Sequence, residues 1–287
     1  MATAMIRRAA RDLVRAAVCL LAAMFVPAMA AAHTDSGRTE AWVREASTGL
    51  YPRAIDALSR IVDPERRLLA VRAYLRVGDA LPERWTWPQE RLASYDSTPE
   101  GKMAGADIDA VCTAFAAANP GFTLEVNRQP RSLESQLAHW NENASVRAVA
   151  ASLTAQLELR FAGITGAPSQ EELRAALVEW KPPVAATLAA PGLSAHGQGR
   201  AFDFQVMRNG RIVAGLDAAS ARARWDAAGW TRRLESAMRV AGGRFSGPLS
   251  SPYEPWHYAY TPAPHGSPAL TARVQGPAPA TLASPQR

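Results

Sequence analysis

The stretch Ala201-Phe-Asp-Phe-Gln-Val-Met207 decides the fold, because apolar and polar side chains alternate along it. In an extended chain its large apolar side chains point to one face and Asp203 points to the other. Asn209-Gly210 follows as a two-residue turn and leads into another extended run, Arg211–Ala214. The pattern predicts an antiparallel hairpin with one buried face and a carboxylate on the opposite face.

Outward from this hairpin, the sequence alternates between helical and extended patterns. Apolar residues recur at helical spacing over residues 39–77, and Asp63-Pro64 marks a helix start within them. Further helices are expected at about 105–118, at 132–159 in two pieces, at 169–180 behind a Ser169–Glu172 capping box, and at 218–241, with strands at 122–127 and 256–260. The mixture predicts an α+β fold, in which a small antiparallel sheet is flanked by helices and preceded by an N-terminal helical region.

The composition is that of a globular protein of moderate charge. The chain has 287 residues, of which 48% are hydrophobic and 20% are charged, and its formal net charge is +6. It contains no basic stripe interleaved with aromatic residues, so nucleic acid is not an expected partner. The sequence leaves the oligomeric state open.

The two ends of the chain differ in composition from the middle. Arginines precede an apolar run at 16–26, and Ala28-Met-Ala30 offers a cleavage site. We interpret residues 1–32 as a signal peptide, with an uncleaved membrane anchor as the alternative. We therefore expect an exported protein, periplasmic or associated with the cell wall, without a membrane span after cleavage. Residues 33–100 are expected to form the helical N-terminal region, and the Pro/Ala-rich residues 263–287 a disordered tail.

Three further side chains have two interpretations each. Cys112 is the only cysteine after the signal, which excludes an intrachain disulfide in the mature chain. We expect it to pack as a small hydrophobic residue, with a reactive thiol as the alternative. Trp85 and Trp87 are expected to cover the edge of a domain, with a sugar-binding surface as the alternative.

The hairpin carboxylate has a histidine close to it in the sequence. His196 lies seven residues before Asp203, and Gly197 and Gly199 allow the chain to turn between them. A solvated position is the ordinary alternative for an aspartate on a strand. His139, on an expected helix, is either structural or lines a cleft.

The last expected strand brings a second histidine beside a carboxylate. In Trp256-His-Tyr-Ala-Tyr260 the aromatic side chains share one face, and His257 lies on the other. Pro255 restricts Glu254 to an extended conformation, which fixes its separation from His257. The alternative is that Glu254 pairs with an arginine. Two histidines, each near a carboxylate, favour a metal site with Glu254 as a base beside it.

These segments together resemble a known family. The stretch Ser194-Ala-His-Gly-Gln-Gly-Arg-Ala-Phe-Asp203 resembles the S-x-H-x-x-G-x-A-x-D signature of the zinc D-alanyl-D-alanine carboxypeptidases, which belong to a wider group with lysostaphin-type peptidases and the hedgehog signalling domain. Glu254-Pro-Trp-His257 is similar to the second signature of the family, E-x-W-H. Arg131-Ser132 with Gln136 resembles a looser third segment, Y-R-S-x-x-x-Q. The resemblance covers about residues 103–262.

The resemblance implies a role for each matching residue. The implied zinc ligands, carried by the small sheet, are His196, Asp203 and His257. The implied catalytic residues are Glu254 as general base and Arg131, which would hold the substrate carboxylate or stabilise the oxyanion. The side chains expected to line the substrate cleft are Ser194, Gln136, Arg131 and Trp256.

By the same resemblance, residues 101–262 would form a zinc peptidase domain. Its substrate would be the D-Ala-D-Ala end of peptidoglycan stem peptides, hydrolysed by a water that zinc activates. The alternatives are a peptidoglycan endopeptidase of the same fold and a non-catalytic domain that binds wall peptides or a partner. Gln129-Pro130 replaces the usual Gly-Tyr of the third segment, and residues 160–191 form a long segment that could act as a flap.

Overall fold

The computed structural model describes residues 36–262, so the expected signal peptide and tail lie outside the described residues. The described helices are α2 (Ser36–Ser47), α3 (Pro52–Ser59), α4 (Pro64–Val77), α5 (Leu81–Arg84), α6 (Gln89–Ser94), α7 (Pro99–Ala118), α8 (Leu133–Glu142), α9 (Ala144–Arg160), α10 (Gln170–Glu179) and α11 (Trp230–Val240). The strands are β1 (Thr123–Val126), β2 (Ala201–Arg208), β3 (Arg211–Ala214), β4 (Phe245–Ser246), β5 (Leu249–Ser250), β6 (Tyr253–Glu254) and β7 (His257–Tyr260).

The strands form a small antiparallel sheet, which confirms the predicted α+β class. Its order is β1-β2-β7-β4, and β3 also pairs with β2. Strands β5 and β6 make a separate hairpin. Strand β2 is the centre of the sheet, because β1, β3 and β7 all pair with it.

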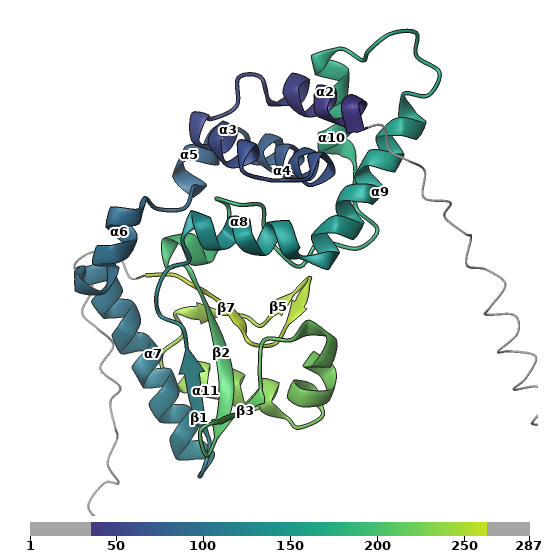
Figure 1. Ribbon diagram of the computed structural model, residues 1–287. Coiled ribbons are helices and arrows are strands. Elements are labelled where there is room, and N and C mark those ends of the chain that lie inside the picture. The colour runs from purple at the N-terminus through teal and green to yellow at the C-terminus, as the bar shows by residue number, and fades with distance from the viewer. Residues whose placement is uncertain (1–35, 263–287) are drawn as a thin grey trace, which may run out of the picture.

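The alternation along β2 has the predicted outcome. Phe202, Phe204 and Val206 are buried, and they form a core with α7, α11 and the aromatic face of β7. We call this the second core; it occupies the lower part of Figure 1. Asp203, on the other face of the strand, is only partly buried. The hairpin turn at Asn209-Gly210 is also confirmed, with both residues at positive φ.

A second set of helices packs around a core of its own. This first core lies among α2, α3, α4, α8, α9 and α10, in the upper part of Figure 1. It therefore unites the N-terminal helices with residues 137–190, which were expected to belong to the domain of the sheet (residues 101–262). The pairing has a simple cause: α4 and α9 both carry apolar faces, and each covers the other.

The chain crosses between the two cores at the tryptophan pair. Trp85 is 2% exposed and belongs to the first core, whereas Trp87 is 8% exposed and belongs to the second. Burial of both rings favours the structural interpretation over a sugar-binding surface. Cys112 is half-buried and packs against the second core, as expected of a small hydrophobic residue.

Side-chain capping explains several helix boundaries. The predicted capping box at Ser169 is present, and Asn143 ends α8 and caps α9, which gives the predicted break in two pieces. Helix α7 begins at Pro99, earlier than predicted, because the Thr98 side chain caps it. The predicted helix at 218–241 is wrong in its middle. Gly229 has a φ of +75°, a conformation that ends regular helix, and α11 starts only after it.

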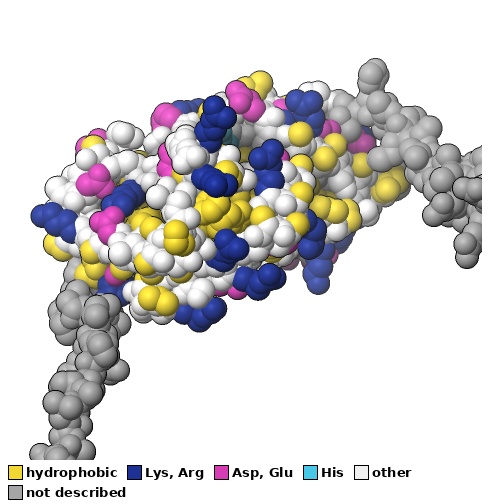
Figure 2. All heavy atoms as spheres, turned by 90° about the horizontal axis from the view of Figure 1, so that it is seen from below, with side chains coloured by type: hydrophobic (Ala, Val, Ile, Leu, Met, Phe, Trp, Pro, Cys, Tyr) yellow, Lys and Arg dark blue, Asp and Glu magenta, His cyan; other side chains and the backbone are white. Residues whose placement is uncertain are grey.

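The surface of the lower part mixes apolar and basic side chains. Seen from below, hydrophobic side chains gather near the middle of the face, with Lys and Arg side chains around them (Figure 2). None of the helices between residues 36 and 262 combines the length and apolar character needed to cross a membrane.

Candidate metal centre

A cleft of about 680 Å³ lies on the face of the sheet opposite the second core. Its walls come from α8, the segment Ala186–Ala189, the loop at Leu193–His196 and the β5–β6 hairpin. His196, Asp203 and His257 all line this cleft. The structure thus brings His257 into one cavity with His196 and Asp203, which come from a distant part of the sequence.

The three side chains form a group that could hold a metal ion. His257 Nδ1 lies 3.0 Å from Asp203 Oδ1, and His196 Nε2 lies 3.2 Å from His257 Nδ1. His196 Nε2 is 3.4 Å from Asp203 Oδ2. All three side chains are between 13% and 18% exposed, so a ligand could still reach them from the cleft.

Strand register and a tight turn create this arrangement. Asp203 and His257 are direct partners in the β2–β7 pair, and both point away from the second core. His196 lies in a short 3₁₀ turn, Ala195–Gln198, which ends at Gly199 with a φ of +60°. Glycine suits that left-handed position, and the chain then enters β2 directly.

The donor set fits zinc. Two imidazole nitrogens and one carboxylate are ligands that zinc accepts, and three protein ligands leave one position open. In a tetrahedral site with bonds of about 2.0–2.1 Å, two ligand atoms lie roughly 3.3–3.4 Å apart. The two histidine nitrogens here lie 3.2 Å apart, which is close to such an edge. Each nitrogen also lies near a different oxygen of Asp203, His257 Nδ1 at 3.0 Å from Oδ1 and His196 Nε2 at 3.4 Å from Oδ2.

The charge states of two of these side chains also suit a cation. Burial lowers the pKa of His196 to about 4, although the Asp203 charge acts in the opposite direction. For Asp203, burial acts to raise the pKa, but the hydrogen bond with His257 and the nearby guanidinium of Arg131 act against it, and the pKa is lowered overall. A neutral imidazole and an ionised carboxylate are the forms that bind a metal.

Glu254 stands beside the cluster. Its Oε2 atom lies 3.7 Å from His257 Nδ1, and its side chain is 15% exposed in the cleft. Burial raises the pKa of Glu254, and the Asp203 charge adds to this, while His257 and Arg131 oppose it. A carboxylate whose pKa is raised toward neutrality is a better general base than an ordinary one.

The other predicted site residues occupy different positions. Arg131 lines the cleft, and its Nη2 donates to Asp203 Oδ2 at 3.4 Å. Ser194 and Trp256 also line the cleft, although the Trp256 ring is largely buried against Trp225. Gln136 does not line it.

The side chain of Gln136 is instead buried and fully bonded. Its Nε2 donates to Thr86 Oγ1 and to the carbonyl of Arg131, and its Oε1 accepts from the Gly192 amide. Gln136 therefore supports the site from the side away from the cleft and does not line the cleft as expected.

Two residues of the site, Thr86 and Asp217, were not predicted from the sequence. Thr86, completely buried at the crossing between the cores, is bonded to Gln136 and carries no local signal of its own. Ala186–Ala189, which belong to the 160–191 segment expected as a flap, form one wall of the cleft. Asp217 lines the cleft from the turn after β3 and was not singled out.

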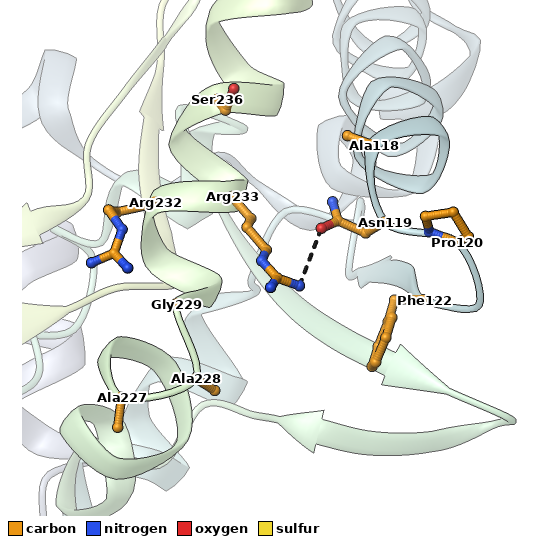
Figure 3. Close-up of a pocket in the computed structure, with 10 residues that line it drawn as sticks. All are labelled: Ala118, Asn119, Pro120, Phe122, Ala227, Ala228, Gly229, Arg232, Arg233 and Ser236. Atoms are coloured by element: carbon orange, nitrogen blue, oxygen red, sulfur yellow. Dashed lines mark hydrogen bonds between the residues drawn. The ribbon is translucent and has the colours of Figure 1, made fainter.

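A cavity of about 590 Å³ elsewhere in the molecule gives a useful contrast. It lies between the end of α7 and the start of α11, where Arg233 donates to Asn119 Oδ1 at 3.4 Å (Figure 3). Its ten lining residues include no histidine, cysteine or carboxylate. Arg232 and Arg233 leave opposite sides of α11 and do not converge (Figure 3). The cavity lacks the groups that metal binding or acid–base chemistry requires.

Comparisons of the chain with protein-family models, curated proteins and solved structures gave no match. The resemblance to zinc D-alanyl-D-alanine carboxypeptidases therefore stays a prediction that rests on the two local motifs and their order.

Proposed function

We propose that this protein is a zinc-dependent peptidase that hydrolyses the D-Ala-D-Ala end of peptidoglycan stem peptides, as a D,D-carboxypeptidase. The observation that carries the proposal is the gathering of a His-Asp-His ligand set, Glu254 and Arg131 in one cleft. The likeness of the two motifs to that family supports the choice of bond, and the export pattern at the N-terminus supports a periplasmic or cell-wall location.

The residues divide the chemistry among them. His196, Asp203 and His257 would hold the zinc ion, which when bound supplies Lewis-acid polarisation and a lowered pKa of water. Glu254 takes a proton from the attacking water and delivers it to the nitrogen of the departing D-alanine. The guanidinium of Arg131 offsets the negative charge that develops on the carbonyl oxygen, or pairs with the terminal carboxylate of the peptide.

The wall formed by Ala186–Ala189 favours one further candidate. A cleft closed on this side by an added segment would fit a different length of peptide, so the same residues could cut inside the stem peptide or its cross-bridge. That candidate is an endopeptidase with the same ligand set and base.

Mass spectrometry of digested peptidoglycan separates these activities. We expect purified protein with zinc to remove one alanine from muropeptides that end in D-Ala-D-Ala, and chelator to abolish the loss until zinc is restored. Conversion of cross-linked muropeptides into smaller fragments would establish the endopeptidase instead. No change in mass with zinc present would contradict both and leave a binding role, and activity that survives chelation would exclude the metal.

A further inference from the structure

The segment that joins the two cores lies directly on the loop that carries His196. We call residues 83–87 the linker segment. The amide of Thr86 donates to the carbonyl of Gly192 at 2.7 Å, and the amide of Trp87 donates to the carbonyl of Gly197 at 3.0 Å. Gln198 Nε2 donates to the carbonyls of Glu83 and Trp85, at 2.7 and 2.8 Å. These four hydrogen bonds help to tie the linker segment to residues 192–198.

Packing leaves this contact no freedom. A Cβ atom on Gly192 would lie 2.5 Å from the ring of Trp85, and one on Gly197 would lie 1.7 Å from Thr86 Oγ1. Only glycine fits at either position, because real Cβ contacts do not become this short. The backbone of the loop at Gly192 and Gly197 thus lies directly against the side chains of Trp85 and Thr86 in the linker segment.

The hydroxyl of Thr86 is the centre of a buried polar network. It donates to the carbonyl of Gly197 at 3.0 Å and accepts from Gln136 Nε2 at 3.0 Å. The same Nε2 atom donates to the carbonyl of Arg131 at 2.9 Å. The amide of Arg131 in turn donates to the carbonyl of His196, also at 2.9 Å. The buried hydroxyl of Thr86 is therefore linked by hydrogen bonds to the backbone beside His196 and, through Gln136, to the backbone of Arg131.

The other two ligands have a different support. The β2–β7 register fixes Asp203 and His257 relative to each other. The position of His196 relative to that pair depends instead on its loop, which Thr86 holds from the side away from the cleft. A shift of that loop would change the distances from His196 Nε2 to the two strand-borne ligand atoms.

We propose that Thr86 is a positioning residue of the metal centre. Thr86 fixes His196 through its bond to the adjacent residue, Gly197, and it fixes Arg131 through Gln136. The N-terminal helices, joined to the sheet through this residue, thereby form part of the site. The inference rests on the proposed function only for its zinc readout. Loss of a residue that holds a metal ligand in place typically weakens metal binding about 10- to 100-fold.

The test compares threonine substitutions of the same chemistry at two buried positions. Thr86→Val removes the hydroxyl and keeps the shape, and Thr86→Ser restores the hydroxyl. Thr154→Val makes the same change in α9, at a threonine that is equally buried but whose hydroxyl has no hydrogen-bond partner among residues 36–262. Two quantities are measured on each full-length variant: the zinc dissociation constant by titration calorimetry, and the hydrogen-exchange rate of the Arg131 amide.

We expect Thr86→Val to raise the zinc dissociation constant about 10-fold or more and to speed exchange at Arg131. Thr86→Ser and Thr154→Val should stay close to the wild type in both. Equal effects of Thr86→Val and Thr154→Val, or none at Thr86, would overturn the proposal. If Thr86→Val does not fold, Gln136→Glu serves in its place, because it removes the two hydrogen bonds that Gln136 donates. We expect it to raise the zinc dissociation constant and to speed exchange at Arg131. If neither quantity changes, the proposal is overturned.

The two readouts separate the two hypotheses. A wild-type protein that binds no zinc would refute the proposed function, while faster exchange at Arg131 in Thr86→Val would still support the positioning role. A wild-type protein that binds zinc with unchanged affinity and exchange in Thr86→Val would refute the positioning role alone.

Discussion

The candidate metal centre has two sides that are built differently. Asp203 and His257 come from paired strands, where the backbone ladder of β2 and β7 sets their spacing. His196 and Arg131 come from loops, and their positions depend on buried contacts with Thr86 and Gln136. The difference teaches that one half of the site follows from local strand geometry, while the other half requires the first core to be in place.

The largest expected effect follows from breaking the strand side. Asp203→Ala removes the only carboxylate of the ligand set, so we expect zinc binding and turnover to fall by more than the ~10- to 100-fold typical of an outer-shell change. Asp217→Ala is the matched control, because that carboxylate also lines the cleft but lies in an exposed turn. Stoichiometric zinc in Asp203→Ala, measured by atomic absorption after dialysis, would contradict the ligand assignment.

The next effect isolates the chemistry from the metal. Glu254→Gln keeps the size of the side chain and removes its ability to accept a proton. We expect zinc content to stay unchanged and kcat to fall about 10²- to 10⁴-fold, the usual contribution of a general base. Steady-state hydrolysis of a D-Ala-D-Ala peptide measures this. Wild-type turnover in the variant would move the base to another residue.

A smaller effect is expected on the loop side at Arg131. Lysine keeps the charge but loses the planar pair of donors, and a hydrogen bond to a charged group contributes about 1.5–3 kcal/mol. We therefore expect Arg131→Lys to lower kcat/KM roughly 10- to 100-fold. Arg128 lies three residues before Arg131 on the same loop, is exposed and pairs with Asp109. Arg128→Lys should therefore leave the kinetics unchanged. Equal losses in both variants would indicate that the segment, and not the Arg131 side chain, matters.

The smallest effect concerns stability. Gly197→Ala forces a methyl group against Thr86 Oγ1, and overpacking of this kind costs about 1–3 kcal/mol. Gly105→Ala in α7 is the control, since its Cβ would meet only the Arg128 side chain, at 4.0 Å, and alanine favours helix. Chemical denaturation should show a lower free energy of unfolding for Gly197→Ala alone. Similar values for both variants would show that the loop yields at no cost.

The sequence predicts the strand side of the site far better than the loop side. The alternation along β2 and the aromatic face of β7 place Asp203 and His257 correctly, because strand periodicity is a local property. The support from Thr86 and Gln136 could not be predicted, because it joins segments from three distant parts of the chain. The break at Gly229 was missed for a related reason: a glycine inside a helical pattern does not reveal whether its φ is positive.

The way the chain crosses between the cores has a consequence for the order of folding. The first core needs residues 42–85 and 137–190, and the second needs residues 87–126 and 202–260. Each core is thus interrupted by half of the other, and contacts of long sequence separation slow folding. During synthesis the first core can fold once residue 190 has left the ribosome. Helix α7 and strand β1 can complete the second core only after β2 and β7 have been synthesised. Thr86 and Gln136, which support the His196 loop, are therefore synthesised and able to pack before Asp203 and His257 leave the ribosome.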